Sequence, residues 1–349
     1  MNSYDIIIIG GGQSALACAC FLQRSGLNYM ILDDQPMSGG AWLHAWDSLT
    51  LFSPAEYSSL PGWMMPKSES RFPLKDEVIA YLKAYEEHYK IKIKRPVLVK
   101  DVNKTSDGFE LETNEGLYHC KVLISATGTW KKPFIPKITG AELFTGKQLH
   151  SAHYKNPDDF KGKKVLVVGS GNSGAQVLAE VSKVATAVWA VRNEPEYLPD
   201  EVDGRVLFNV ASAKYHAMQS GKEFDATQYS LGKIVMVPPV VEARERKALQ
   251  FNLTFKAITE KGVIWSGGTE EMFDVIIWCT GFKYATDQLK SLNIVDENGK
   301  IETIETKSTA FPGLFLVGYG NWTGFASATL IGVGRSARNT INQITEYLK

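Results

Sequence analysis

One supersecondary pattern occurs twice in the chain and constrains its fold more than any other feature. In each copy a short β-branched run leads into a glycine-rich turn, a helical segment follows, and a second apolar run closes the unit. In the first copy the strand covers residues 6–9, the turn residues 10–15, the helix ends near Gly26, and the second strand covers residues 29–32. In the second copy the strand covers residues 164–168, the turn 169–174, the helix 175–184 and the second strand 187–191. Because such a run forms a parallel βαβ unit, we predict an α/β protein with two doubly wound, Rossmann-like dinucleotide-binding domains.

The first turn has the pattern G-x-G-x-x-A. Gly10 permits the tight turn, Gly12 lets a pyrophosphate approach the backbone, and Ala15 lets the helix pack closely on the strand. The free N–H groups at the start of the helix would face the phosphates. Asp33, with Asp34 as the neighbouring alternative, ends the next strand, where an acid binds ribose hydroxyls. An acid there disfavours a 2′-phosphate, so this turn suits the adenosine of FAD. The competing interpretation is a glycine-rich turn that binds no ligand.

The second turn has the full pattern G-x-G-x-x-G. At the position where the first unit has Asp33, 23 residues after the first glycine, the second unit has Arg192. A guanidinium can pair with a 2′-phosphate through two hydrogen bonds, so the sequence favours NADPH here, with NADH as the alternative. The competing interpretation is a solvated arginine at a strand end. The residues that we expect to contact this cofactor are Gly169, Gly171, Asn172, Ser173, Gly174, Arg192 and Asn193.

The composition argues against several partners and reactions. Lysine plus arginine and aspartate plus glutamate number 38 each, which gives no electrostatic reason to expect nucleic acid or an anionic membrane as a partner. The N-terminus lacks the basic region of a secretory signal, and glycines interrupt the apolar run near it, so we expect a soluble, cytoplasmic protein. The four cysteines, Cys18, Cys20, Cys120 and Cys279, form no C-x-x-C pair. This argues against a flavoenzyme that reduces disulfides.

Two further strands end at turns of small residues. Residues 121–125 lead into the turn 126–128, and residues 274–279 lead into the turn 280–281. Both turns are natural hinges between modules. They predict where the chain passes from one domain to the other.

The predicted FAD-binding domain is discontinuous. It comprises residues 1–155 and 279–349, and the NAD(P)H-binding domain, residues 156–278, is inserted in it. The final helix is predicted over about residues 326–348. Its positive N-terminal end would favour the negative charge of reduced flavin.

The segment that joins the two predicted domains carries a rare motif. Residues 144–154 have the pattern F-x-G-x-x-x-H-x-x-x-Y, whose four fixed positions would arise by chance in such a chain about one time in a thousand. With this motif the chain resembles the flavin-containing monooxygenases, especially their short bacterial members. The related Baeyer–Villiger monooxygenases typically have Trp where this chain has Tyr154. The resemblance covers almost the whole chain, because residues 39–42, 46–54 and 318–322 look like the family's flavin-contacting segments.

The motifs and the resemblance together indicate the site residues. Those expected at FAD are Gly10, Gly12, Gln13, Ser14, Ala15, Asp33, Asp34, Gly40, Trp42, Val97, Ala126, Thr127, Gly128, Gly320 and Asn321, and Thr280 and Gly281 join the NADPH set. Trp46 and Phe52 are expected to cover the flavin as part of an aromatic loop, although each could be a core residue. We interpret His150 as a structural part of the motif rather than a general base.

The resemblance also implies the reaction. NADPH reduces FAD, the reduced flavin takes up O₂ as a C4a-(hydro)peroxyflavin, and this species oxygenates a thioether or amine, or inserts oxygen beside a ketone carbonyl. The protein needs no metal for this, only a dry pocket over the flavin. A homodimer is expected from the family alone. The alternatives are an NADPH oxidase that releases peroxide, an NAD(P)H:acceptor flavin reductase, and a non-catalytic NAD(P)H or flavin sensor on the same fold.

Overall fold

The computed structural model describes residues 2–221 and 232–349, and the chain divides into two compact units. Unit 1 comprises the residues up to Leu43, Ser53–Lys132 and Lys283–Lys349, and unit 2 comprises His44–Phe52 and Pro133–Phe282. The predicted boundaries at residues 155 and 279 differ from this division. The segment from Pro133 onward lies in unit 2 because its strand β7 pairs with a strand of that unit.

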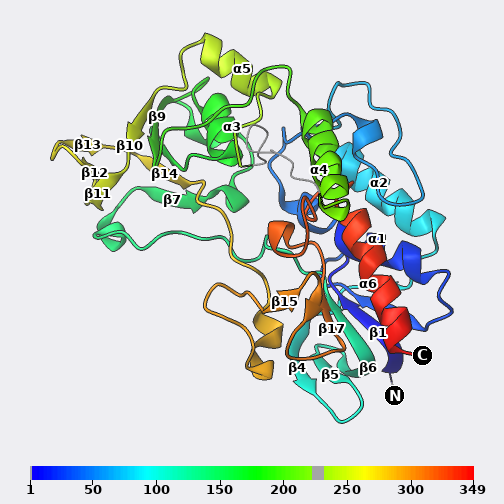
Figure 1. The fold of residues 1–349 in the computed structure, drawn as a ribbon. Coiled ribbons are helices and arrows are strands. Elements are labelled where there is room, and N and C mark those ends of the chain that lie inside the picture. The colour runs from blue at the N-terminus through cyan, green and yellow to red at the C-terminus, as the bar shows by residue number, and fades with distance from the viewer. Residues whose placement is uncertain (1, 222–231) are drawn as a thin grey trace. The chain divides into compact units, whose positions relative to one another are not determined.

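Unit 1 is built on a mixed sheet with a parallel centre in the order β3-β2-β1-β6-β17 (Figure 1). The central strand β1 (Asn2–Ile9) pairs in parallel with β2 (Tyr29–Leu32) and β6 (Gly116–Ser125). The other strands of this sheet are β3 (Ile93–Lys94), β4 (Val99–Lys104), β5 (Phe109–Thr113), β15 (Thr303–Ile304), β16 (Lys307–Ser308) and β17 (Leu314–Leu316). The isoleucines at positions 6–9 of β1 are almost completely buried, as expected of a strand that is covered on both faces.

Three α-helices accompany this sheet in the described residues of unit 1: α1 (Gln13–Leu22), α2 (Lys75–His88) and α6 (Val333–Tyr347). Helices α1 and α6 pack side by side although they lie at opposite ends of the chain (Figure 1). Helix α6 begins later than the predicted residue 326. Ala326 has a φ of +57° and Gly324 a φ of +130°, and neither angle is compatible with a right-handed helix. The predicted start was therefore wrong.

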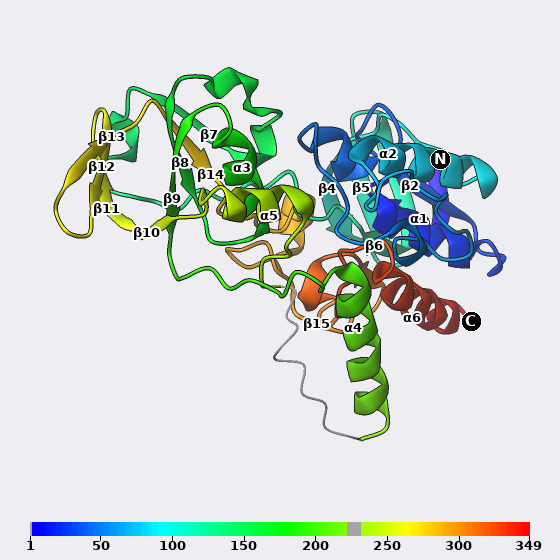
Figure 2. The ribbon, with the colours of Figure 1, turned by 90° about the horizontal axis from the view of Figure 1, so that it is seen from above.

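Unit 2 is built on a parallel sheet in the order β10-β9-β8-β14-β7. Its strands are β7 (Lys147–His150), β8 (Lys164–Val168), β9 (Thr186–Val191), β10 (Phe251–Leu253) and β14 (Val275–Trp278). The helices are α3 (Asn172–Val181), α4 (Gly204–Gln219) and α5 (Pro238–Glu245), and α3 and α5 pack against each other (Figure 2). A small antiparallel sheet consists of β11 (Phe255–Ile258), β12 (Gly262–Trp265) and β13 (Glu270–Met272).

The two units share one local arrangement. In unit 1 α1 follows β1, and in unit 2 α3 follows β8, each after a glycine-rich turn and each beside a parallel neighbouring strand. The predicted α/β fold class with two dinucleotide-binding modules is confirmed. Within the described ranges, every helix is too short or too polar to cross a lipid bilayer.

Candidate dinucleotide-binding sites

The first glycine-rich turn connects β1 to α1 and leaves room for a phosphate. Gly10 has a φ of +95°, and a Cβ at this position would lie 2.7 Å from the carbonyl oxygen of Ala126. A side chain at position 10 would therefore be strained and would clash. A Cβ on Gly12 would meet nothing closer than the Cα of Gly40, at 3.7 Å. The start of α1 is thus open to a ligand, while Ala15 inside the helix is fully buried.

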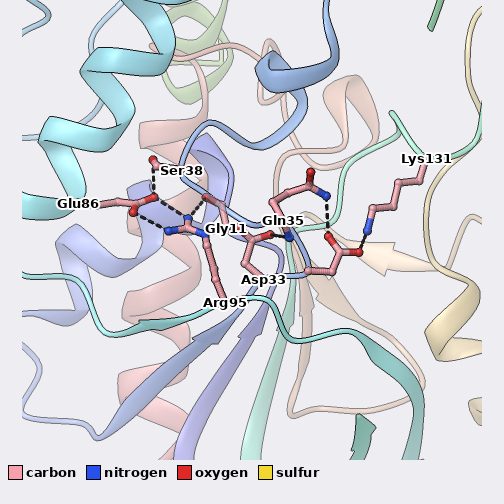
Figure 3. A network of polar contacts seen from close by, with 8 residues as sticks. Gly11, Asp33, Gln35, Ser38, Glu86, Arg95 and Lys131 are labelled. Carbon is pink, nitrogen blue, oxygen red and sulfur yellow. Dashed lines mark hydrogen bonds and ion pairs between the residues drawn. The ribbon is translucent and has the colours of Figure 1, made fainter. Parts of the chain in front are cut away.

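The two acids after β2 lie in different settings. Asp33 is 2% exposed, and its Oδ2 accepts a hydrogen bond of 2.6 Å from Arg95 Nε. Asp34 is less buried, forms an ion pair with Lys131 and accepts a hydrogen bond of 2.8 Å from Gln35 Nε2 (Figure 3). Asp33, predicted to bind the ribose, is therefore the acid that the fold holds in one orientation.

The side chain of Gln13 joins three segments of unit 1. Its Nε2 donates to the carbonyl oxygen of Ala328 (2.7 Å), and its Oε1 accepts from Trp42 Nε1 (3.1 Å). These two bonds fix the orientation of the amide, while the second N–H of Nε2 and the backbone N–H of Gln13 keep the capacity to donate to a ligand. Ser14 is buried beside Gly318, where a Cβ would overlap the Ser14 hydroxyl.

The first hinge turn rests on a cluster of hydroxyl groups. Thr127 Oγ1 donates to the carbonyl oxygen of Ala285 (2.5 Å) and lies 2.8 Å from the hydroxyl of Tyr319, which lies 2.6 Å from Ser125 Oγ. Gly128 has a φ of +63°, and a Cβ on it would meet nothing within 4 Å. Hydrogen bonds of Thr127 thus fix the turn on one side, and the space beside Gly128 is open.

The other predicted FAD residues are placed as follows. Val97 is buried, and its N–H donates to the carbonyl oxygen of Asp33 (2.8 Å), so it lies beside the end of β2. The N–H of Ala126 donates to the carbonyl oxygen of Ile9. Asn321 is exposed and makes no side-chain hydrogen bond with another described residue, and Gly320 before it has a φ of +68°.

The second turn connects β8 to α3 and repeats the steric pattern of the first. Gly169 has a φ of +134°, and a Cβ on it would overlap the carbonyl oxygen of Cys279. A Cβ on Gly174 would overlap the carbonyl oxygen of Gly169, so the helix approaches the turn as closely as its backbone allows. A Cβ on Gly171 would meet nothing within 4 Å. The N-terminus of α3 is therefore as open as that of α1.

Asn172 connects the second turn to the segment that begins at Lys233. Its Nδ2 donates to the carbonyl oxygen of Lys233 (3.1 Å), and its Oδ1 accepts from the N–H of Val235 (2.8 Å). Lys233 is thus placed beside the start of α3, where its ammonium group lies 3.3 Å from Glu196. The two hydrogen bonds of Asn172 thus hold this segment beside the second turn. Ser173, the next helical residue, is half-buried.

Arg192 follows β9 and is exposed. Among the residues that the structure describes, it makes no hydrogen bond and no ion pair, and Asn193 beside it is also exposed. The guanidinium is free to bind an anion at this strand end.

The linker motif at residues 144–154 fastens its segment to unit 2. Phe144 is buried, and a Cβ on Gly146 would lie 2.6 Å from the carbonyl oxygen of Asp274. Tyr154 is 1% exposed, and its hydroxyl donates to Glu180 Oε2 of α3 (2.7 Å). Burial, followed by the charge of Glu180, raises the pKa of Tyr154. The motif positions a strand and the helix that bears the second turn.

His150 of the motif is fully paired. Its Nδ1 accepts from the N–H of Ala152 (3.0 Å), which leaves Nε2 to donate to the carbonyl oxygen of Gly281 (3.0 Å). Gly281 also accepts from the N–H of Phe134, and Phe134 accepts from Thr280 Oγ1 (2.5 Å). Burial lowers the pKa of His150. The histidine supports the second hinge turn, and both ring nitrogens have protein partners.

Trp46 and Phe52 lie in unit 2, not in unit 1 with the first turn. Trp46 is 7% exposed and packs edge to face on Tyr154, at 6.4 Å between ring centroids. Phe52 is half-buried and packs on Phe208 at 5.8 Å. Their expected position over the flavin stays a prediction.

The four cysteines are all free thiols. Burial raises the pKa of Cys18, Cys120 and Cys279 to about 12 in each case. A thiol of that pKa is not ionised near neutral pH and is a poor nucleophile.

Both turns fit an adenine dinucleotide by the same criterion. Each has a first glycine that tolerates no side chain, a second glycine with open space before the helix N-terminus, and a polar residue at the end of the neighbouring strand. Free N–H groups and a positive helix end suit a pyrophosphate. The strand-end residues have opposite charges, so the two sites suit different adenosine groups.

Comparison with known proteins gives a consistent result. The family model described as pyridine nucleotide-disulphide oxidoreductase matches residues 7–318. A solved flavin-containing monooxygenase from Stenotrophomonas maltophilia is 45% identical, with a TM-score of 0.92 and full coverage of both chains. Among curated proteins, the uncharacterized oxidoreductase CzcO of Bacillus velezensis is 32% identical over 98% of this chain and 99% of its own. The probable indole-3-pyruvate monooxygenase YUCCA1 of Arabidopsis thaliana is 29% identical over 97% and 89%.

Proposed function

The chain belongs to the pyridine nucleotide-disulphide oxidoreductase family and, within it, to the flavin-containing monooxygenases, and we propose that it uses NADPH and FAD to oxygenate a small soft nucleophile or a ketone. It is an oxidoreductase that uses FAD and NAD(P)H. The proposal extends this to the assignment of each cofactor to one turn, to the preference for NADPH, and to the class of substrate.

The opposite charges at the two strand ends carry the assignment. Asp33 in unit 1 offers an acceptor to ribose hydroxyls and repels a 2′-phosphate, whereas Arg192 in unit 2 offers donors to a 2′-phosphate. FAD has a free adenosine ribose and NADPH has a phosphorylated one. FAD therefore belongs at the turn of Gly10 and Gly12, and NADPH at the turn of Gly169 and Gly171.

Further residues would hold each cofactor. At the first turn the open start of α1 would take the FAD pyrophosphate, and the backbone of Gly40 lies close to Gly12 at the same helix end. At the second turn the start of α3 would take the NADPH pyrophosphate. The backbone of Lys233 lies beside that helix end, and its ammonium group is paired with Glu196.

Bound FAD would supply the oxygen-activating chemistry, with NADPH as the electron donor. The overall reaction balances as NADPH, a proton, O₂ and a thioether giving NADP⁺, water and a sulfoxide. The protein contributes binding and orientation, and exclusion of water from the reacting atoms. No protein nucleophile is required, which agrees with the full pairing of His150 and the un-ionised state of the buried thiols.

A coupling measurement tests the proposal. The purified yellow protein is incubated with NADPH, O₂ and methyl phenyl sulfide, and the sulfoxide formed is compared with the NADPH consumed, with parallel reactions on a tertiary amine and a cyclic ketone. We expect oxygenated product in a ratio near one to NADPH with at least one of these substrates.

Three other outcomes would contradict the proposal in different ways. Hydrogen peroxide as the sole product of oxygen would indicate an NADPH oxidase. Transfer of electrons to an added dye, without oxygenation, would indicate a flavin reductase. An unchanged flavin spectrum after anaerobic addition of NADPH would indicate a non-catalytic sensor.

A further inference from the structure

Arg95 lies at the centre of a buried polar network beside the first turn (Figure 3). Its side chain is 12% exposed, and its Nε donates to Asp33 Oδ2 at 2.6 Å. Its Nη1 and Nη2 donate to the two carboxylate oxygens of Glu86 at 2.7 Å each. Nη2 also donates to the carbonyl oxygen of Gly11 at 3.3 Å. One guanidinium thus joins the end of β2, the glycine-rich turn and helix α2.

Glu86 holds Arg95 in place and also neutralises it. The Glu86 side chain is 11% exposed, and its Oε1 accepts a further hydrogen bond of 2.8 Å from Ser38. Because Arg95 is paired with Glu86 at two points, its charge is not available to a phosphate. Counting Asp33 and Glu86 against Arg95, the network keeps a net negative charge. An arginine near a ribose site would ordinarily suggest a 2′-phosphate, and this pairing argues against it.

The carboxylate of Asp33 is confined from two sides. Arg95 occupies Oδ2, and the backbone of Gly11 lies so close that a Cβ at position 11 would overlap the same oxygen. From the described residues, Oδ1 accepts one long hydrogen bond of 3.4 Å, from the N–H of Gln35. A carboxylate oxygen can accept two hydrogen bonds, so Oδ1 keeps capacity for a ligand.

We propose that Arg95 is a positioning residue for FAD, which fixes the Asp33 carboxylate so that Oδ1 faces the hydroxyls of the adenosine ribose. Gly11 has a second part in this arrangement, since any side chain there would displace Asp33. The inference rests on the proposed position of FAD at the first turn. It adds that the ribose is read by an acceptor whose orientation is set by Arg95, a residue 62 positions from Asp33 in the chain.

An FAD analogue tests this inference on the full-length protein. The flavin is removed, and the dissociation constants of FAD and of an analogue without the 2′- and 3′-hydroxyls of the adenosine ribose are measured by flavin fluorescence. In the unaltered protein we expect the analogue to bind about tenfold more weakly, because a hydrogen bond to a charged group is lost. In the double variant Arg95→Met, Glu86→Met, which removes one positive and one negative buried charge together, this ratio should fall to about two.

The controls separate positioning from general damage. Arg24→Met removes an exposed arginine of unit 1 and should leave the ratio at about ten. Asp33→Asn should reduce the ratio as the double variant does. If the double variant does not fold, Arg95→Lys serves in its place, since a single ammonium group cannot hold Asp33 and Glu86 as the fork does.

Each remaining outcome overturns the inference. A ratio near one in the unaltered protein would mean that Asp33 does not read the ribose. A ratio that stays near ten in the double variant, or in Arg95→Lys when that variant stands in for it, would mean that Asp33 needs no positioning. If the double variant binds FAD and the analogue more weakly by the same factor, Arg95 has only a structural role. Failure of the proposed function looks different, because the unaltered protein would then bind no FAD or form no oxygenated product.

Discussion

The two glycine-rich turns share a backbone pattern and differ in the state of the residue at the neighbouring strand end. Asp33 in unit 1 is 2% exposed and is held by Arg95, which is itself held by Glu86. Arg192 in unit 2 is exposed and has no partner among the described residues. The first site holds its charged group among protein partners, whereas the second exposes its charged group to solvent.

This difference fits the cofactor that we propose for each site. A preorganised, buried site loses little entropy on binding and favours long residence, which suits a flavin that stays through many turnovers. An exposed guanidinium makes a weaker, exchangeable contact, which suits a nicotinamide cofactor that leaves oxidised after each cycle. On the proposed assignment, the side chains alone would make the first turn a site for a resident cofactor and the second a site for an exchanging one.

The largest expected effect comes from the introduction of a negative charge at Gly12 or at Gly171. A Cβ would clash with nothing at Gly12 or at Gly171. Both positions precede a helix with extended backbone angles, where aspartate is a favourable N-cap. Folding should survive, but the new carboxylate would repel a pyrophosphate by about 3 kcal/mol, or about 100-fold in affinity. Gly12→Asp should purify colourless, and Gly171→Asp should purify yellow with its KM for NADPH raised about 100-fold.

Neutral caps at the same positions are the matched controls. Gly12→Ser and Gly171→Ser add a side chain without a charge and should change binding several-fold less. A yellow Gly12→Asp protein, or loss of flavin from Gly171→Asp alone, would break the assignment of the two cofactors to the two turns.

A smaller effect is expected at Arg192. Arg192→Ala should raise the KM for NADPH about 30-fold, because a charge-assisted contact worth about 2 kcal/mol is lost, and should change the KM for NADH less than about twofold. Steady-state kinetics with both cofactors measures this. Arg192→Lys should retain part of the preference, since the charge remains but the fork is lost. Equal changes for NADPH and NADH would show that Arg192 does not read the 2′-phosphate.

The smallest expected effect is a pH dependence of thermal stability that comes from His150 in unit 2. Burial lowers the pKa of His150, so the unfolded chain takes up a proton at a higher pH than the folded one. The stability that depends on the neutral ring is complete above the ordinary histidine pKa of about 6.5 and declines as the pH falls below it. Protonation would also remove the Nδ1 acceptor from Ala152. We expect the Tm to fall modestly between about pH 7.5 and about pH 5.5.

His150→Gln is the control for the histidine, because its amide offers one acceptor and one donor but does not titrate. The decline in Tm over the same pH interval should be smaller in this variant. An identical decline would assign the acid sensitivity to other groups.

Most of the fold could be predicted from the sequence because its signals are local. The β-branched runs, the glycines at 10, 12, 169 and 171, and the strand-end residues Asp33 and Arg192 all lie within single βαβ units. The predicted start of the last helix was wrong because apolar and small residues continue past Gly324. Nothing in that pattern shows that Ala326 takes a φ of +57°. The boundaries of the units also differ from the prediction, since the pairing of β7 with β14 joins segments more than a hundred residues apart.

The sequence by itself determined the two dinucleotide-binding turns and the charge at each strand end, because a backbone that must turn tightly and approach a phosphate restricts which residues can occupy those few positions. Only the tertiary structure decided how the charges are used. The hold of Arg95 on Asp33, the bond of Tyr154 to Glu180 and the placement of Lys233 beside Asn172 all join distant segments. Such contacts depend on where the folded chain brings its side chains together, and no local pattern encodes them.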